Sequence, residues 1–218
     1  MDDPAADAEP KQRRVRRKEA RPSELVEAAL ALFVEKGFAA TRVEEVAARA
    51  GVSKGTLFLY FPSKEELFKA VVRETIAGRF TEWHQELDNF QGSNAELVRY
   101  CMHSWWERIG MTAASGITKL VMSEASMFPE IAAFYQQEVI GPGHDLLRRV
   151  LQRGMDSGEF RPLHLDYAVY SLIAPMIFLL MWKHAMTPCC PASHTIDPIT
   201  FIDSQLSLLL NGMVAPAC

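Results

Sequence analysis

Apolar residues recur every three or four positions through the first part of the chain, which is the spacing of amphipathic helices. The first predicted helix has Pro22 in its first turn, where the missing N–H does no harm. It ends at Gly37, because glycine readily adopts the left-handed conformation that closes a helix. Its apolar face is formed by Leu25, Ala28, Ala29, Leu32 and Phe33. Phe38, directly after this helix, is expected to fill the core of a small N-terminal unit.

Residues 41–69 predict two short helices joined by a tight turn and followed by a third helix. Thr41 and Glu44 are spaced as a capping box, so the first of these helices should begin at Thr41. Gly51 ends it, and Ser53 is placed to cap the next helix. This pattern is typical of the helix-turn-helix motif, whose second helix enters the major groove of DNA.

The second helix of this motif carries residues suited to contact DNA. Lys54, Gly55 and Thr56 lie at its leading end. A glycine inside a helix costs roughly 1 kcal/mol relative to alanine, so close approach to a phosphate or base is a reason for Gly55. Ser63 and Glu66 form another capping box, which predicts that a long helix begins there and runs to about residue 90.

Further helices fill the rest of the chain. They are expected over about 94–110, 112–127, 131–154, 164–186 and 197–213, with an interruption at Gly141-Pro142-Gly143. No strand-length alternation appears, so the fold class is all-α. We expect an N-terminal three-helix helix-turn-helix DNA-binding head over residues 21–68 and a larger C-terminal helical body for ligand binding and dimerisation over residues 69–218. Residues 1–20 are expected to form a disordered arm, first acidic and then basic.

Residues 167–182 contain no charged side chain. A membrane span needs about twenty apolar residues, and Pro175 interrupts this shorter run, which favours a buried helix and no membrane partner. The two apolar C-terminal helices offer more hydrophobic surface than one body can cover. They predict a two-fold homodimer with a four-helix interface over residues 164–186 and 197–213.

Charge is unevenly distributed along the chain, whose formal net charge is −4. Residues 11–64 hold twelve Lys or Arg against six Asp or Glu, whereas residues 65–218 hold eleven against seventeen. A basic front on an acidic body is typical of a protein that docks one end on phosphates. The acidic and then polybasic N-terminus lacks the apolar run of a signal peptide, and the four cysteines form no regular framework, so we expect a cytoplasmic protein.

The segment Gly51-Val-Ser-Lys-Gly-Thr-Leu-Phe-Leu-Tyr-Phe-Pro-Ser-Lys-Glu-Glu-Leu resembles the recognition segment of the TetR/AcrR family of bacterial transcriptional regulators. The preceding Leu25-Val-Glu-Ala-Ala-Leu-Ala-Leu-Phe-Val-Glu-Lys-Gly-Phe resembles the first helix of that family. The resemblance covers about residues 21–70. It implies a dimer that holds two recognition helices about one DNA turn, roughly 34 Å, apart over a near-palindromic operator in double-stranded DNA.

The resemblance also implies roles for individual residues. The position of Thr41 caps the second helix and touches phosphate, positions 53 to 57 face the groove, and the aromatic before the proline and Lys64 grip the backbone. The predicted DNA-binding residues are Thr41, Arg42, Ser53, Lys54, Gly55, Thr56, Leu57, Tyr60 and Lys64. The chain departs from many members at Phe58 and Leu59, where two tyrosines are common, so hydroxyl contacts to phosphate are lost there.

The body is rich in methionine and aromatic residues, which most often form plain core but also line adaptable pockets. Members of the family commonly bind a small molecule there and release DNA. We therefore expect a small apolar or aromatic effector that relieves repression. The candidate pocket residues are Met102, Trp105, Trp106, Met122, Phe134, Tyr170 and Phe178.

Three other functions compete with this hypothesis. A thiol or metal sensor would use Cys189, Cys190 and His194, but their spacing matches no common zinc site, so no metal or other cofactor is expected. A non-sensing architectural DNA-binding dimer would lack an effector. An enzyme is not expected, because the chain has no glycine-rich phosphate loop, nucleophile elbow or zinc-protease signature. His103 and His184 are expected to be hydrogen-bonded residues rather than ligands.

Overall fold

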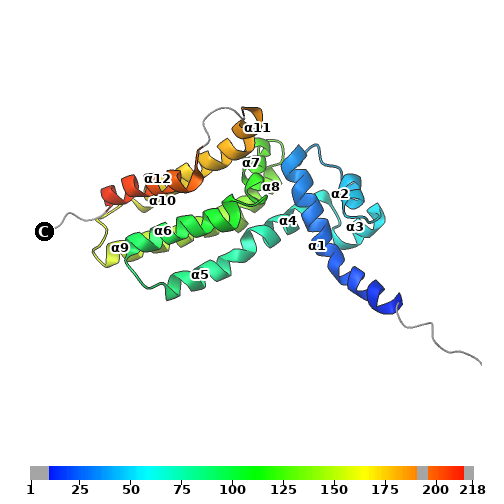
Figure 1. The fold of residues 1–218 in the computed structure, drawn as a ribbon, viewed down its shortest axis with the longest axis horizontal. Helices are drawn as coiled ribbons and strands as arrows, with labels where there is room; N and C mark the ends of the chain where they lie inside the picture. The colour runs from blue at the N-terminus through cyan, green and yellow to red at the C-terminus, as the bar shows by residue number, and fades with distance from the viewer. Residues whose placement is uncertain (1–9, 191–195, 214–218) are drawn as a thin grey trace, which may run out of the picture. The chain divides into compact units, whose positions relative to one another are not determined.

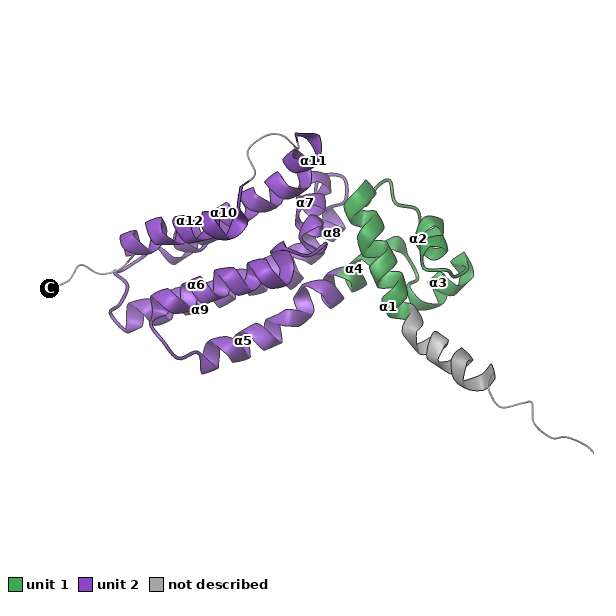
Figure 2. Cartoon of the chain, in the orientation of Figure 1, with its two compact units in different colours: residues 1–71 green, residues 72–218 purple. Residues whose placement is uncertain are grey.

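The computed structural model describes the backbone of residues 10–190 and 196–213 and the side chains of residues 22–190 and 196–213. In these residues the chain is helical and forms no β-strand, so the predicted all-α class is confirmed. The chain divides into two compact units, residues 1–71 and 72–218, which we call the head and the body (Figure 2).

The head is built from α1 (Pro10–Lys36), α2 (Val43–Arg49), α3 (Lys54–Tyr60) and the first part of α4 (Lys64–Thr75). Three phenylalanines form its centre, because the rings of Phe33, Phe38 and Phe68 lie 5.6 Å apart in every pairing. All three side chains are fully buried, as are Leu25 and Leu57. The prediction that Phe38 fills the core of the head is confirmed.

Two predicted helix starts in the head are wrong. Helix α1 begins at Pro10 rather than near Pro22, which lies inside the helix, where it cannot donate the usual backbone hydrogen bond. The expected disordered arm therefore divides: residues 10–20 continue α1, and residues 1–9 lie outside the described residues. Helix α2 is capped one residue later than predicted, at Arg42, whose backbone N–H donates to Glu45 Oε2 over 3.3 Å.

The turn between α2 and α3 forms as the sequence predicts. Gly51 has a φ of +68°, a left-handed conformation that side chains other than glycine rarely adopt. Ser53 then caps α3, because its Oγ accepts a hydrogen bond of 3.1 Å from the backbone N–H of Thr56. Ser63 caps α4 in the same way through the N–H of Glu66.

The long helix predicted from Ser63 to about residue 90 is divided. Helix α4 ends at Thr75, a 3₁₀ turn η1 (Ala77–Arg79) follows, and α5 (Phe80–Asn89) continues the chain. A Cβ on Gly78 would lie 2.9 Å from the carbonyl oxygen of Arg73, so only glycine allows the chain to turn so closely on α4. The apolar spacing runs on through the break, which is why the sequence does not reveal it.

The body continues with helices that alternate with three π-helical turns (Figure 1). In chain order these elements are α6 (Asn94–Trp105), η2 (Trp106–Gly110), α7 (Ser115–Glu124), α8 (Pro129–Tyr135), η3 (Gln136–Ile140), α9 (Gly141–Asp156), α10 (Leu165–Met181), η4 (Trp182–Met186), α11 (Thr187–Cys189) and α12 (Pro198–Met213). The interruption expected at Gly141 is a π-helical turn that passes directly into α9.

The long helices of the body pack side by side. Helix α6 lies against α9 and α12, α10 lies against α9 and α12, and α7 and α8 lie at one end (Figure 1). Their shared core includes the fully buried side chains of Leu97, Ile117, Ile131 and Leu151. The stretch Leu165–Cys189 is long and apolar enough to cross a membrane by length and composition, and 28% of its most apolar window is buried inside the body.

Candidate DNA-binding and ligand-binding sites

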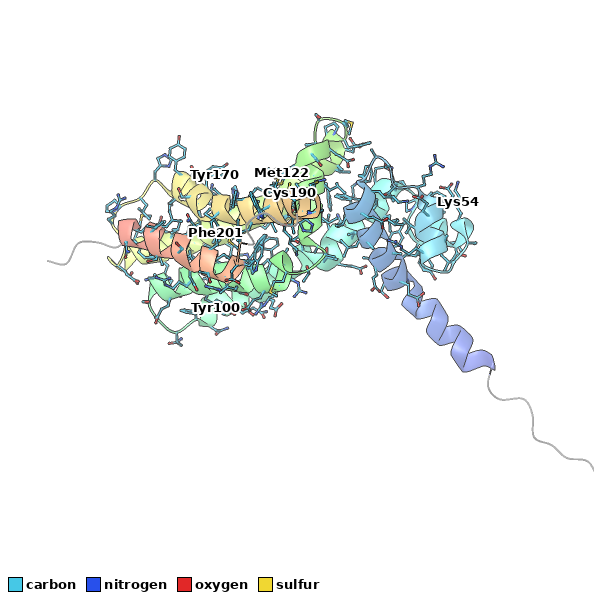
Figure 3. The ribbon with its side chains drawn as sticks, turned by 45° about the horizontal axis from the view of Figure 1, so that its top comes forward. Lys54, Tyr100, Met122, Tyr170, Cys190 and Phe201 are labelled. Atoms are coloured by element: carbon cyan, nitrogen blue, oxygen red, sulfur yellow. The ribbon has the colours of Figure 1, made fainter. Side chains whose placement is uncertain are left out.

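The leading end of α3 presents polar groups on the surface of the head. Ser53, Lys54 and Gly55 are exposed, and Thr56 is half-buried with its Oγ1 2.9 Å from Ser53 Oγ. Lys54, labelled in Figure 3, has its Nζ 2.6 Å from Glu44 Oε1 and 5.6 Å from the centre of the Phe58 ring. The positive charge of Lys54 is therefore already paired with a carboxylate in the head.

Gly55 has no structural requirement within the head. A Cβ at this position would meet only Ser53 Oγ, at 3.8 Å, which is an ordinary van der Waals contact. Alanine would fit and would favour the helix by roughly 1 kcal/mol. Packing within the head therefore does not require glycine at position 55. A bare backbone at this exposed position is what close approach of another molecule would require.

Three predicted DNA-binding residues have other tasks. Leu57 is fully buried in the head and cannot face a groove. Thr41 is 1% exposed, and its hydroxyl donates to the carbonyls of Leu32 and Gly37 instead of capping α2. Lys64 turns inward, with its Nζ 2.8 Å from the carbonyl of Phe38, 3.1 Å from that of Thr41 and 4.4 Å from the centre of the Phe38 ring.

Two apolar residues of α3 are exposed, although the prediction from the sequence gives them no contact with DNA and notes only that they lack tyrosine hydroxyl groups. Leu59 is 84% exposed and Phe58 is 38% exposed. Exposed apolar groups beside a recognition helix can contact the methyl group of thymine. Of the remaining predicted residues, Arg42 is exposed at the start of α2 and Tyr60 is half-buried at the end of α3.

The body encloses a cavity of about 630 Å³, within the range of small-molecule sites. Its walls come from α5, α6, α7, α8, η3, α9 and α10. Four of the seven predicted pocket residues line it: Met102, Trp105, Met122 and Tyr170. Figure 3 labels Met122 on α7 and Tyr170 on α10, and both side chains are more than half exposed, so they lie where the cavity opens.

The other three predicted pocket residues do not line the cavity. Trp106 is buried against Gly110, where no Cβ could fit beside its ring. Phe134 packs its ring 4.9 Å from the guanidinium of Arg73. Phe178 is 44% exposed and packs beside Trp182 and Phe201. Trp105 lines the cavity, whereas its neighbour Trp106 is directed into the packed core beside Gly110.

Sequence reasoning missed polar residues in the cavity wall. Thr118 Oγ1 lies 2.9 Å from the hydroxyl oxygen of Tyr135, and burial raises the pKa of Tyr135 to about 12. Cys101 also lines the cavity, and burial raises the pKa of its thiol to about 12, so the thiol is protonated. Thr118, Tyr135 and Cys101 lie at helical spacing from apolar residues of their helices, which indicates a buried face. That spacing does not distinguish the wall of a cavity from a filled core.

The candidate histidines are hydrogen-bonded, as predicted. His103 Nε2 lies 2.8 Å from Asp203 Oδ1, and His184 Nε2 lies 2.7 Å from Ser115 Oγ. Cys189 and Cys190 are exposed, and His194 lies outside the described residues. In the part of the chain that is described, no group of three His, Cys, Asp or Glu side chains is placed to hold a metal ion.

Known proteins resemble both units. Residues 25–71 match the model of bacterial regulatory proteins of the tetR family, and residues 91–197 match a tetracyclin repressor-like C-terminal domain. The transcriptional repressor KstR2 of Rhodococcus jostii is 25% identical over 201 residues, which cover 91% of this chain and 94% of that protein. The fatty acid metabolism regulator protein of Bacillus subtilis is 25% identical over 199 residues, 90% of this chain and 98% of that one.

A solved structure shares the fold. The transcriptional regulator FadR from Bacillus subtilis, in complex with stearoyl-CoA, superposes with a TM-score of 0.69 and 20% identity, covering 87% of this chain and 98% of that chain. The two family models thus match the head and most of the body, and KstR2 is similar along nearly the whole chain. The chain belongs to the TetR family of bacterial transcriptional regulators.

Proposed function

We propose that the protein is a ligand-responsive repressor that occupies a near-palindromic operator as a dimer and leaves it when a small apolar or aromatic molecule fills the body. The observation that carries this proposal is the largely apolar cavity of about 630 Å³ in the body. An architectural DNA-binding dimer has no need of such a space. The relatives matched along the chain are regulators, which supports a binding protein rather than an enzyme. The proposed regulator works in the cytoplasm.

DNA contact is assigned to the exposed leading end of α3. Ser53, Lys54, Gly55 and Thr56 supply it, and Arg42 and Tyr60 flank them. Lys54→Ala should weaken operator binding about tenfold and reduce the slope of log affinity against log salt by about 0.9, the value for one phosphate contact. Thr56→Ala should instead change the preferred sequence, which selection of bound fragments from random duplex DNA would measure.

Dimerisation is assigned to α10 and α12. These helices carry five large exposed apolar side chains, and an apolar patch formed by such side chains marks an interaction surface. The five residues are Tyr167, Tyr170, Phe178, Ile199 and Leu208. Light scattering should give a molecular mass of two chains for the parent protein and of one chain for the Phe178→Glu variant.

A contact between α4 and the cavity wall supplies a route for release. Gln136, Val139 and Ile140 of η3 line the cavity, and Glu138 of the same turn pairs with Arg73 of α4 over 3.4 Å. Helix α4 continues into the head, where Lys64 holds the carbonyls between α1 and α2. A ligand that displaces η3 therefore acts on a helix shared by both units, which can change DNA affinity by favouring one conformation.

The deciding experiment measures operator binding with and without candidate effectors. Long-chain acyl thioesters are the first probes, because the similar fatty acid metabolism regulator and the FadR complex with stearoyl-CoA point to that class. Trp83 and Trp105 line the cavity, so an effector should quench tryptophan fluorescence at the concentrations that release DNA. Operator affinity and fluorescence unchanged across a broad apolar panel would favour the architectural function instead.

A further inference from the structure

The cavity wall contains three buried hydroxyl groups among its apolar residues. Ser104 of α6 and Thr118 of α7 are each 6% exposed, and Tyr135 of α8 is 4% exposed. All three line the cavity. Helices α7 and α8, which carry the Thr118–Tyr135 pair, pack against each other. The wall therefore has polar positions on α6, α7 and α8, two of which lie side by side.

These hydroxyl groups have unused hydrogen-bonding capacity. Thr118 and Tyr135 share one hydrogen bond of 2.9 Å, so one of their two protons remains to be donated. Ser104 Oγ is buried and has no hydrogen-bond partner among the described residues. A buried polar group without a partner costs about 1–3 kcal/mol, so a ligand that supplies the partner recovers part of that cost.

The same cavity has no cation available for a negatively charged ligand. Among the described lining residues, Glu86 carries a charge, and it is already paired with Arg108 over 2.8 Å. His144 also lines the cavity, and burial lowers its pKa, with the neighbouring charge of Arg148 acting in the same direction. His144 is therefore neutral near pH 7. A carboxylate drawn inside would lose its water without gaining a partner of opposite charge, which is strongly unfavourable.

We propose that the part of the effector held in the cavity is an uncharged hydrocarbon that carries one oxygen group, a hydroxyl or the carbonyl of a ketone, ester or thioester, hydrogen-bonded by Ser104 and the Thr118–Tyr135 pair. This inference rests on the proposed function, in that it takes the cavity as the effector site. It distinguishes two related classes of lipid. An esterified or reduced chain fits the cavity, whereas the free acid of the same length does not.

The test uses the full-length protein and three probes of equal chain length: 1-dodecanol, methyl dodecanoate and dodecanoate at pH 7.5. Binding is followed by tryptophan quenching and confirmed by calorimetry. The alcohol and the ester should bind at least tenfold more tightly than the carboxylate. Equal or tighter binding of the carboxylate overturns the inference but leaves the cavity as an effector site. Failure of all three probes to bind overturns the inference and the proposed effector site together.

Two substitutions test the assigned hydroxyl groups. Tyr135→Phe and Thr118→Val each remove one hydroxyl with little change in shape, and each should weaken alcohol and ester binding about two- to twelvefold, since a neutral hydrogen bond contributes about 0.5–1.5 kcal/mol. Ser123→Ala is the matched control, because it removes an exposed hydroxyl from the same helix as Thr118 at a position that does not line the cavity, and it should change neither affinity. Circular dichroism confirms that each variant is folded. Unchanged alcohol and ester affinities in both folded variants would contradict the proposal.

Discussion

The head and the body handle apolar side chains differently. In the head, three phenylalanine rings meet at 5.6 Å in every pairing, and the residues around them are fully buried. In the body, a comparable supply of leucine, methionine and aromatic residues surrounds an open volume of about 630 Å³. A filled core holds one arrangement of side chains, whereas a cavity loses van der Waals contacts along its walls and leaves room for rearrangement. The first suits a surface that must match DNA, and the second suits a site that must respond.

The two units also differ in charge, in a way that overall counts conceal. Residues 22–64 hold five Lys or Arg and five Asp or Glu, so this part of the head is neutral. Lys36, Arg49 and Lys54 are each paired with a glutamate, and Lys64 binds backbone carbonyls. The positive excess assigned to the front of the chain lies in residues 11–21, which hold seven Lys or Arg and one Glu. Attraction to DNA should therefore depend on that segment.

The largest effect should come from matched leucine truncations. Leu57→Ala, in the solid head, should cost about 3–5 kcal/mol, whereas Leu147→Ala, in the cavity wall, should cost about 1–2 kcal/mol because its side chain already faces empty space. Urea unfolding measures both costs. The four tryptophans all lie after residue 82, so fluorescence reports the body and circular dichroism reports the whole chain. Equal costs at the two sites would remove the contrast in packing.

The next effect concerns the basic segment. Replacing Arg13, Arg14, Arg16 and Arg17 by glutamine should lower operator affinity about 100-fold near physiological salt and reduce the salt slope by up to about 3.6, since each lost phosphate contact removes about 0.9. The preferred sequence should stay the same, because phosphate contacts carry no base information. Arg49→Gln, which breaks an ion pair with Glu35, is the control. A slope that is unchanged in the fourfold variant would return the electrostatic role to the head.

A smaller effect separates stability from DNA binding at Gly55. Gly55→Ala should stabilise the free head by roughly 1 kcal/mol, because alanine favours the helix and meets no close atom there. Operator affinity should fall in the same variant if the backbone approaches DNA at this point. Thermal unfolding and fluorescence anisotropy on one preparation measure the two quantities. Greater stability with unchanged affinity would remove Gly55 from the DNA surface.

The smallest effect is a pH dependence of the body. Burial lowers the pKa of His184, and the charges of Lys183 and Lys119 lower it further. The unfolded chain therefore binds the proton more readily, so stability should fall as the pH drops through the ordinary value of about 6.5 and stop falling below the lowered pKa. His144 shifts in the same direction. Urea midpoints from pH 7.5 to 5.5 should decline less in His184→Asn than in the parent, and identical slopes would contradict this role.

The sequence predicted the elements that local signals determine. Gly51, Ser53 and Ser63 mark the turn and the two helix starts, and each acts as its residue type suggests. The sequence did not predict whether individual side chains face the core or the surface. Leu57 belonged both to an apolar stripe and to a segment expected to face DNA, and the structure assigns it to the core. The family resemblance implies that Lys64 grips the DNA backbone, but its ammonium group binds the carbonyls of Phe38 and Thr41.

The cavity was only partly predictable for a related reason. Methionine and aromatic residues at helical spacing indicate a buried face, but a filled core and an empty pocket share that pattern. Trp105 and Trp106 are equally large and apolar, so the sequence alone does not tell that Trp105 lines the cavity and Trp106 packs against Gly110. The hydroxyl groups of Thr118 and Tyr135 come together from different helices, and no spacing along the chain reveals that meeting.

The π-helical turn η3 fixes the register between two stretches of the chain. A π-helical turn holds about one residue more than an α-helical turn, so everything after Ile140 is rotated by about 100° from where an unbroken α-helix would place it. Deleting a single residue from this turn would let the α-helix close up and leave Leu146, Leu147, Val150 and Leu151 of α9 facing the core, whereas closing the turn without a deletion would rotate them away from it. Alignments of this chain with relatives should therefore be expected to gain or lose one position at this turn, and a gap placed elsewhere in α9 would assign the wrong side chains to the cavity wall.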